Sequence, residues 1–376
     1  MTQMQLILHL PRPSRLVGHI HARVRSLDVE IDIIRDVLDH YGFKLSEPPR
    51  NLPLSRRSRN VALDTSAGKL VLKRYRPEWQ VTTIVYGHSV LTRLAELNFP
   101  APRLVVTPDG DTFVSHDGQN YALFSFVRGT SYCSSYVPRA HWLKLVALAG
   151  RTLARFHRQL EGFVPTGHHH LGFESYTADR KRDRAWYIEQ LNETREISQR
   201  LVRSEDKASA NWLVENTDLM VEELQRLDEI LRAALLPRLV VHGDYAIQNL
   251  LFQPDGTVTV LDFELARMEW RLSDLVTSLA RFRHGSGVFD LECMRHFVGS
   301  YQAEYPISPD EWWYLPQVWQ LRRIQRAAQS WRAYFASSGS TRQLAVARKA
   351  LCESAWAQRH QDELRAMNPA HSRSRG

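Results

Sequence analysis

Two short stretches of the chain decide the fold: His242-Gly243-Asp244-Tyr245-Ala246-Ile247-Gln248-Asn249 and Leu261-Asp262-Phe263-Glu264. Between them, the apolar and β-branched segments 250–252 and 258–261 flank a Pro-Asp-Gly turn at 254–256. This pattern predicts a tight β-hairpin. Because Asn249 and Asp262 lie at its two ends, the hairpin would bring them to the same end of a strand pair.

The side chains of these stretches suit phosphoryl transfer, which needs one carboxylate to orient and deprotonate a hydroxyl group and oxygen ligands to hold magnesium. We expect Asp244 to be that base. Magnesium prefers hard oxygen ligands and takes one or two carboxylates from protein, so we expect Asn249 and Asp262 to bind Mg²⁺. Gly243 would let the loop turn tightly. A buried polar strand end explains Asp244 alone equally well, but the complete set in this order favours catalysis.

Lys73 lies in an otherwise apolar stretch, Val71-Leu72-Lys73-Arg74-Tyr75, which we expect to be a strand. A lysine in such a strand is costly unless its ammonium group meets an anion. The alternative is an edge-strand lysine whose ammonium group reaches solvent. The preceding turn has no Gly-x-Gly, but it carries Ser55 and Ser58. Their hydroxyls, with backbone N–H groups, could cover phosphates.

The dense apolar stretch 121–127 ends at Arg128-Gly129, which is typical of a strand that runs into a hinge. Backbone groups of Ser125, Phe126 and Val127 would then pair with an adenine ring. A plain buried strand explains the same pattern, and the two interpretations are compatible.

Together these residues resemble the aminoglycoside phosphotransferase and choline kinase-like superfamily, which includes homoserine-kinase-like and spore-coat-type kinases. The matching motifs are His242 to Asn249, Leu261 to Glu264, Leu72-Lys73-Arg74-Tyr75, Leu123 to Gly129, Phe99-Pro100-Ala101-Pro102 and Leu153-Ala154-Arg155-Phe156-His157. The resemblance covers residues 28–335. It implies an α+β, bilobal protein-kinase-like fold, ATP at the hinge with Lys73 on its phosphates, Mg²⁺, and a hydroxyl acceptor bound by helices of the second lobe.

The resemblance also implies supporting roles for His242, Glu264 and Asp274. Asp274 begins Asp274-Leu275-Val276, where the family commonly has Asp-Leu-Ala. We expect its carboxylate to brace the catalytic loop by accepting hydrogen bonds.

One departure concerns Lys73. Family members often pair the strand lysine with a glutamate on the N-lobe helix, and that place falls near Gly87 or His88 here. Lys73 would then be held by phosphate alone, or by Glu78 or Glu96.

The order of elements predicts two lobes. Residues 1–127 would form the N-lobe, with an N-terminal helix, an antiparallel sheet, a second helix and the nucleotide-covering turn. Residues 128–376 would form a mostly helical C-lobe that holds the catalytic loop, one hairpin and basic C-terminal helices. The main expected helices are 28–41, 79–97, 143–160 and much of 312–367, and the expected strands are 61–63, 70–75, 104–106, 112–114, 121–127, 239–242, 250–252 and 258–261.

The net charge of +8 belongs to the C-terminal segment, because residues 322–376 hold eleven Lys or Arg against three Asp or Glu. Solvated helix faces and a loose tail explain this charge, and so does a positive rim beside a site for an anionic partner. Nucleic-acid binding by these helices is a further hypothesis, and it is the one that the sequence favours least. It predicts an affinity for nucleic acid that depends on salt concentration.

Other features bound the class of protein. No apolar run approaches the roughly 18 residues that span a bilayer, and residues 1–10 lack the features of a signal peptide. Cys133, Cys293 and Cys352 show no metal-ligand spacing, so we expect free thiols in a cytoplasmic protein. We expect the tract at 168–170, three histidines, to bind no metal. Nothing in the sequence predicts the oligomeric state.

The leading hypothesis is therefore an ATP- and Mg²⁺-dependent kinase of a small hydroxyl compound, such as a sugar or an amino alcohol. Arg322, Arg323 and Arg326 would repel a polycationic aminoglycoside. An aromatic group at Trp312, Trp313, Trp319 and Trp331 could bind a quaternary ammonium, although helix core is the better explanation. The second hypothesis is a catalytically weak, kinase-like protein that binds a nucleotide or a partner.

Overall fold

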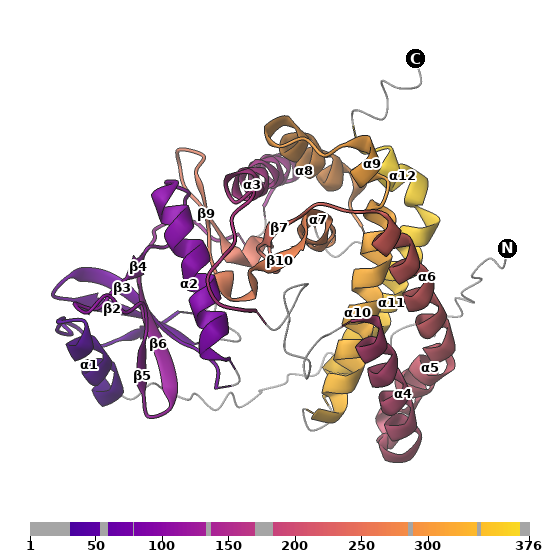
Figure 1. The fold of residues 1–376 in the computed structure, drawn as a ribbon, viewed down its shortest axis with the longest axis horizontal. Helices are drawn as coiled ribbons and strands as arrows, with labels where there is room; N and C mark the ends of the chain where they lie inside the picture. The colour runs from indigo at the N-terminus through magenta and orange to yellow at the C-terminus, as the bar shows by residue number, and fades with distance from the viewer. Residues whose placement is uncertain are drawn as a thin grey trace.

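The computed structural model describes residues 31–52, 59–77, 79–132, 137–169, 183–284, 289–336 and 340–368. They form two lobes that lie side by side, a sheet with two helices and a larger, mostly helical part (Figure 1). The sequence predicted this order of a β-rich part followed by helices.

The N-lobe is built on an antiparallel sheet with strand order β1-β2-β3-β6-β4, and β5 pairs with β6. Its strands are β1 (Arg50–Asn51), β2 (Arg59–Thr65), β3 (Gly68–Arg74), β4 (Leu104–Val105), β5 (Val114–His116) and β6 (Gln119–Ser125). β2 and β3 extend further than predicted, because Thr65 pairs with Gly68 and only two residues remain in the turn. The strand predicted at 112–114 begins later, at Val114.

Alternation along the strands gives the sheet two apolar faces, each covered by one helix. Leu72 and Leu123 pack in a cluster with α1 (Ile31–His40). Their neighbours in sequence point to the other face, where Ala122 and Phe124 join a cluster that includes α2 (Val81–Glu96). The same alternation puts Lys73, next to Leu72, on the face that looks toward the C-lobe. The sequence position of Lys73 thus fixes the direction of its side chain.

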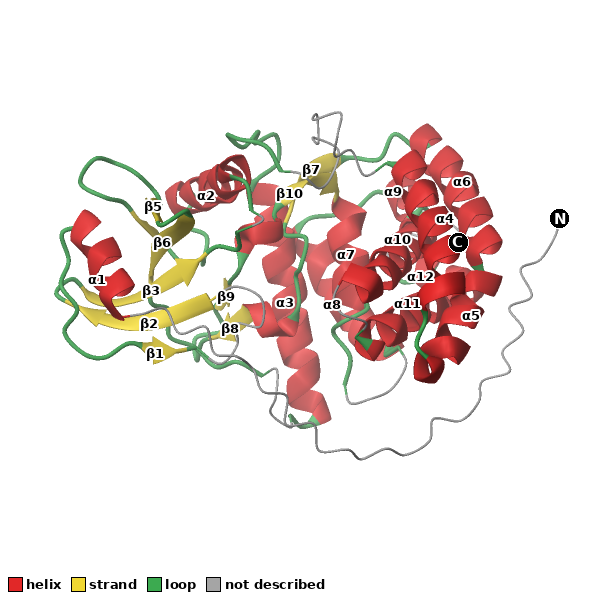
Figure 2. Cartoon of the chain, turned by 90° about the horizontal axis from the view of Figure 1, so that it is seen from below, coloured by secondary structure: helices red, strands yellow, loops and turns green. Residues whose placement is uncertain are grey.

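The C-lobe combines helices with two small two-stranded sheets (Figure 2). Its helices are α3 (Arg139–Gln159), α4 (Arg184–Leu201), α5 (Lys207–Glu215), α6 (Thr217–Ala233), α7 (Arg271–Leu279), α8 (Leu291–Glu304), α9 (Pro309–Trp312), α10 (Leu315–Ala336), α11 (Thr341–Arg359) and α12 (Gln361–Arg365). The predicted hairpin is present as β8 (Leu250–Phe252) and β9 (Val258–Val260). A second pair, β7 (Arg238–Val241) with β10 (Arg267–Trp270), was only half predicted, because β10 has only four residues and none of them is β-branched.

Backbone contacts and a shared core join the lobes. Between the lobes, the N–H of Val260 donates to the carbonyl of Pro100. Just after the boundary, within the C-lobe, Thr130 and Phe252 exchange two backbone hydrogen bonds. The cluster on the inner face of α2 continues without a break into α3, α7 and α10. We propose a lobe boundary between Val127 and Arg128, because the chain leaves the N-lobe sheet just before these residues, at the end of β6.

Three of the four tryptophans discussed above belong to this core. Trp312, Trp319 and Trp331 are at most 2% exposed, which confirms the core interpretation. Trp313 is 45% exposed and stacks against the guanidinium group of Arg365. Within the described ranges, no helix combines the length and the apolar character needed to cross a bilayer.

Candidate active site

The catalytic loop leaves β7 and turns sharply at Gly243. Gly243 has a φ of +79°, and a Cβ added there would lie 2.3 Å from the carbonyl oxygen of Leu265. A side chain at this position would be strained by the backbone conformation and would collide with the neighbouring segment. The loop therefore needs glycine immediately before Asp244, as the sequence indicated.

Asp274, on α7, anchors the loop through backbone hydrogen bonds. Its carboxylate accepts hydrogen bonds from the backbone N–H groups of His242 (2.5 Å) and Gly243 (2.8 Å). The ring of His157, on α3, lies 3.2 Å away from the same carboxylate and 2.7 Å from the hydroxyl of Tyr301. Asp274 and His157 are completely buried.

The charge state of this buried pair follows from its partners. Burial opposes ionisation of Asp274, but the hydrogen bonds from His157 and Gly243 outweigh it and lower the pKa of the carboxyl. Burial lowers the pKa of His157, against the attraction of Asp274. The histidine is thus neutral at pH 7. Its Nε2–H donates to Asp274 and its Nδ1 accepts from Tyr301, so the loop rests on an ionised carboxylate with every position satisfied.

Asp244 and Asn249 face one another across the loop. The amide nitrogen of Asn249 donates to the backbone carbonyl of Asp244 (2.9 Å) and to its carboxylate Oδ2 (3.2 Å). Since these contacts use the nitrogen, the side-chain oxygen of Asn249 remains available to a cation. Asp244 is partly exposed, at 24% of its side chain, so a bound molecule can reach its carboxylate.

Asp262 lies beside this loop at the end of the hairpin. The N–H of Leu261 donates to the carbonyl of Asn249 (2.8 Å), and the ring of His242 lies 2.9 Å from the Leu261 carbonyl. These bonds fix Asp262 next to Asn249. Asp262 itself has a φ of +63°, an uncommon conformation for a residue other than glycine and one that recurs at functional sites.

Lys73 reaches from the N-lobe sheet to both acidic residues of the second motif. Its ammonium group lies 2.7 Å from Asp262 and 3.1 Å from Glu264. The expectation that phosphate alone, Glu78 or Glu96 would hold this lysine is therefore corrected. Glu96 pairs with Arg93 at the exposed end of α2, and Glu78 lies outside the described residues.

Burial alone would lower the pKa of Lys73, but the charges of Asp262 and Glu264 outweigh it and hold the pKa above its usual value. The lysine is charged, and its ammonium group lies where these carboxylates concentrate negative potential. The side-chain oxygens of Asn249 and Asp262 are hard donors of the kind that magnesium prefers. The chemistry of this donor set fits the predicted metal.

Two of the three backbone N–H groups in the predicted hinge already donate hydrogen bonds within the protein. The N–H of Ser125 donates to Arg103 O (2.8 Å) and that of Phe126 to Lys69 O (3.3 Å). Within the described part of the chain, the N–H of Val127 makes no hydrogen bond. Of the three predicted amides, it is thus the one available to adenine.

Ser55 and Ser58 lie outside the described residues, as does the last histidine of the 168–170 tract. His169 packs against the rings of Trp79 and Tyr86, and its Nε2 lies 3.2 Å from the backbone carbonyl of Glu264.

The sequence did not point to Arg281, which follows α7. Its guanidinium group pairs with Asp244 at 2.5 Å. The signal was absent because 37 residues separate the two positions and no local spacing relates them.

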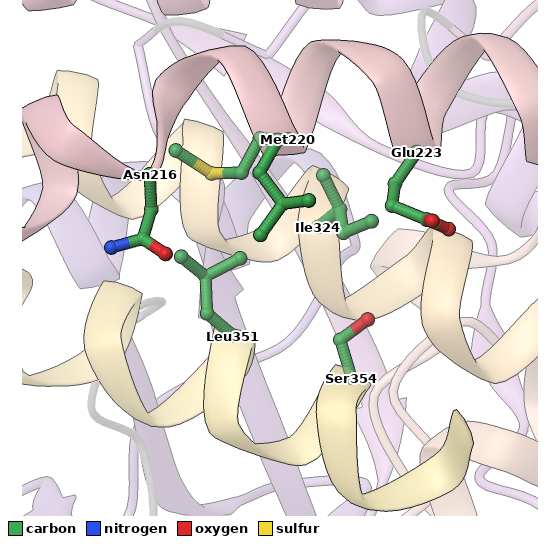
Figure 3. Close-up of a pocket in the computed structure, with 7 residues that line it drawn as sticks. Asn216, Met220, Glu223, Ile324, Leu351 and Ser354 are labelled. Atoms are coloured by element: carbon green, nitrogen blue, oxygen red, sulfur yellow. The ribbon is translucent and has the colours of Figure 1, made fainter. Parts of the chain in front are cut away.

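A small cavity between α6, α10 and α11 lies outside this constellation (Figure 3). Its apolar wall comes from Met220, Ile324 and Leu351. None of the candidate catalytic, metal-binding or hinge residues lines it.

Comparison with known proteins shows which protein family the sequence matches. A model of the phosphotransferase enzyme family matches residues 50–311. A homoserine kinase from Caulobacter sp. (strain K31) is 26% identical over 259 residues, which cover 67% of this chain and 70% of that protein.

Solved structures show the same fold at low identity. The microcompartment-associated aminopropanol kinase aligns with a TM-score of 0.61 and 18% identity, covering 89% of this chain and 98% of that chain. An aminoglycoside phosphotransferase from Alicyclobacillus acidocaldarius aligns with a TM-score of 0.59 and 18% identity, covering 88% and 95%. The predicted α+β, bilobal protein-kinase-like fold is confirmed.

Proposed function

The chain belongs to the phosphotransferase enzyme family, and from this premise we propose that it transfers the γ-phosphoryl group of ATP to a hydroxyl group of a small molecule. The observation that carries the proposal is the meeting of Asp244, Asn249, Asp262 and Lys73. These residues come from three separate segments, and direct hydrogen bonds and ion pairs link them into one site.

In this proposal, Asp244 is the base. Its carboxylate orients the acceptor hydroxyl and takes its proton as the oxygen–phosphorus bond forms. The bond between the γ-phosphorus and the β–γ bridging oxygen breaks, and ADP leaves. Asp274 keeps the loop rigid during this step, since a displacement of about 1 Å can cost two orders of magnitude in rate.

The other residues position the nucleotide. Lys73 would exchange its contact with Asp262 for the phosphates, while Glu264 keeps the ammonium group in place. Asn249 and Asp262 would hold magnesium, which would neutralise charge on the phosphate oxygens when bound. The Val127 amide and the carbonyls of Ser125 and Phe126 would contact adenine. The hydroxyl groups of Ser55 and Ser58 would cover the phosphates.

The acceptor is a small hydroxyl compound, such as a sugar or an amino alcohol. The names of the relatives, homoserine kinase and aminopropanol kinase, support this class. The arginines of α10 argue against a polycationic aminoglycoside. We place the reaction in the cytoplasm, where ATP is available, and we assign no nucleic-acid partner.

The alternative of a catalytically weak binding protein rested on the missing helix glutamate. Glu264 supplies a carboxylate to Lys73 at 3.1 Å, so that argument no longer favours it. The catalytic proposal therefore ranks first.

The proposal is tested with Asp244→Asn, which keeps the shape of the side chain and removes its capacity as a base. Phosphate transfer to a pool of small hydroxyl metabolites, followed by mass spectrometry, should fall by about two to four orders of magnitude. Binding of a non-hydrolysable ATP analogue should change little. Asp218→Asn, on the exposed first turn of α6, is the matched control and should remain fully active. Full activity of Asp244→Asn would exclude the assigned role.

A further inference from the structure

Segment 166–169, which follows α3 in the chain, lies along α2. The backbone N–H of His168 donates to the hydroxyl oxygen of Thr82 at 2.7 Å. The N–H of Thr166 donates to the hydroxyl oxygen of Ser89 at 2.9 Å. These bonds join a segment of the C-lobe to a helix of the N-lobe and fix the path of the chain between the two.

The approach of this segment to α2 requires glycine. Gly167 has a φ of +90°, and a Cβ added there would lie 2.5 Å from the backbone carbonyl oxygen of Thr82. A side chain at this position would be strained and would collide with the backbone of a helix. Gly162 has a similar φ of +71°, but a Cβ added to it would meet nothing within 4 Å. The two glycines therefore differ in the space around them, while both adopt a left-handed conformation.

The path of segment 166–169 brings the side chain of His169 to the candidate active site. His169 is 2% exposed, and its ring meets the rings of Trp79 and Tyr86 edge-on, with centroids 5.7 and 6.0 Å away. Its Nε2 lies 3.2 Å from the backbone carbonyl oxygen of Glu264. Because a carbonyl oxygen only accepts hydrogen bonds, this nitrogen carries a proton and donates it. The histidine thus makes a buried hydrogen bond to the second motif.

Glu264 belongs to a short 3-10 helical turn, Phe263–Leu265, which directly follows the candidate metal ligand Asp262. The carbonyl of Leu265 accepts a hydrogen bond from the guanidinium group of Arg267 at 2.9 Å. Side chains from outside the turn therefore hold two of its carbonyls. Asp262 has a φ of +63°, a conformation that a residue other than glycine keeps only where the surrounding structure fixes it.

The position of this turn determines where Lys73 is held. The ammonium group of Lys73 lies 2.7 Å from Asp262 and 3.1 Å from Glu264. The side chain of Glu264 is 6% exposed, so its carboxylate is enclosed by protein and follows the backbone of the turn. A hydrogen bond that fixes the carbonyl of Glu264 therefore also fixes the carboxylate that pairs with Lys73.

We propose that His169 is a positioning residue of the nucleotide site: its Nε2–H holds the turn, and through Glu264 it holds Lys73 where the phosphates of ATP bind. The inference rests on the proposed function, which gives the phosphates to Lys73. His169 itself contacts neither the nucleotide nor the acceptor. Segment 166–169 directs the ring through its bonds to α2, and His169 and Glu264 both belong to the C-lobe.

The test measures binding of AMP-PNP with Mg²⁺ by calorimetric titration, which needs no turnover. His169→Phe keeps an aromatic ring and removes the donor, and it should raise Kd about tenfold, as expected for the loss of one hydrogen bond to a buried group. His169→Gln carries an amide N–H that can reach the same carbonyl, and it should recover most of the affinity. His168→Gln is the matched control, because His168 is exposed, and it should bind as the wild type does.

A pair of glycine variants tests the same contact without changing the histidine. Gly167→Ala should push segment 166–169 away from α2 and weaken binding of the analogue about as much as His169→Phe. Gly162→Ala introduces comparable backbone strain without a collision, and it should leave Kd unchanged. Equal Kd values for the wild type, His169→Phe and Gly167→Ala would overturn the inference and leave the kinase proposal standing.

A double-mutant cycle with Glu264→Gln separates positioning from stability. If His169 acts through Glu264, His169→Phe should have little further effect on Kd once Glu264 is replaced. Effects on Kd that multiply independently would contradict this route. A purely structural histidine would lower the urea midpoint of His169→Phe and leave its Kd unchanged, which would also overturn the inference. In steady-state kinetics, His169→Phe should raise KM for ATP and leave KM for the acceptor unchanged, because Asp274 holds the catalytic loop separately.

The outcomes distinguish the two proposals. Weaker binding of AMP-PNP to His169→Phe and Gly167→Ala, together with no phosphate transfer by the wild type to any hydroxyl compound, would support the inference and contradict the kinase proposal. Failure of the wild type to bind AMP-PNP with Mg²⁺ would contradict both.

Discussion

Among individual residues, His88 shows how burial sets a charge state next to the candidate site. It is 3% exposed on α2. Its ring nitrogens lie 2.7 Å from the hydroxyl of Tyr75 and 2.8 Å from that of Thr112. Burial lowers the pKa of His88 to about 3, and the charge of Lys73 adds to this. His88 is thus a packed core histidine.

This residue predicts a pH dependence of stability. A histidine with a lowered pKa in the folded state takes up protons only on unfolding, so its stabilising contribution is complete above about pH 6.5 and is lost as the pH falls toward 3. Between pH 7 and pH 5, the wild type should lose up to about 2 kcal/mol of unfolding free energy that His88→Gln does not lose. Urea unfolding at both pH values measures the difference. Parallel pH profiles for the two proteins would contradict the assignment.

Among the elements, α3 and α8 cross unusually closely. A Cβ added to Gly150, on α3, would lie 2.3 Å from the backbone carbonyl oxygen of Phe297, on α8. Backbone cannot yield as a flexible side chain can, so the crossing requires glycine. The crossing matters for the site because α3 also carries His157, which contacts Asp274.

Gly150→Ala should therefore destabilise the protein by about 1–3 kcal/mol through overpacking. Gly299, on α8, is the matched control, because an added Cβ there meets nothing within 4 Å. Gly299→Ala should stabilise by up to about 1 kcal/mol, as expected for an exposed helical glycine. Thermal unfolding distinguishes the two variants, and equal effects of both would contradict the close crossing.

The elements also show which parts of the structure the sequence could predict. The hairpin β8–β9 was predicted because its turn residues and its strands are adjacent in the chain. β10 was missed because it is only four residues long and has no β-branched residue, and its pairing with β7 requires distant partners. In the site, the spacing of Asp244 and Asn249 was readable locally. The pairing of Lys73 with Glu264 was not, since it depends on how the lobes meet.

On the scale of the whole molecule, the two hydrophobic clusters do not coincide with the two lobes. One contains α1 and the outer face of the N-lobe sheet. The other joins the inner face of that sheet and α2 to the helices of the C-lobe. The inner half of the N-lobe therefore depends on the C-lobe for its burial, and Lys73 crosses the same boundary with its ion pairs.

Two fully buried leucines test this division. Leu38, on α1, belongs to the outer cluster, and Leu94, on α2, to the shared one. Each Leu→Ala change should cost about 2–5 kcal/mol. Hydrogen exchange followed by mass spectrometry should show faster exchange confined to α1, β2 and β5 for Leu38→Ala. For Leu94→Ala it should extend into α3 and α7, and an effect limited to α2 would argue against a shared core.

The partner of Lys73 has a consequence for how such a protein can be governed. In protein kinases, the lysine's glutamate sits on helix αC, and displacing that helix silences the enzyme. Here the glutamate follows Asp262 by two positions in the same rigid segment. An outward movement of α2 would leave the ion pair of Lys73 with Glu264 intact. An inhibitory protein could therefore not inactivate the enzyme by displacing this helix. We expect the site to stay assembled at all times, so that the rate of the enzyme depends on the concentrations of its two substrates.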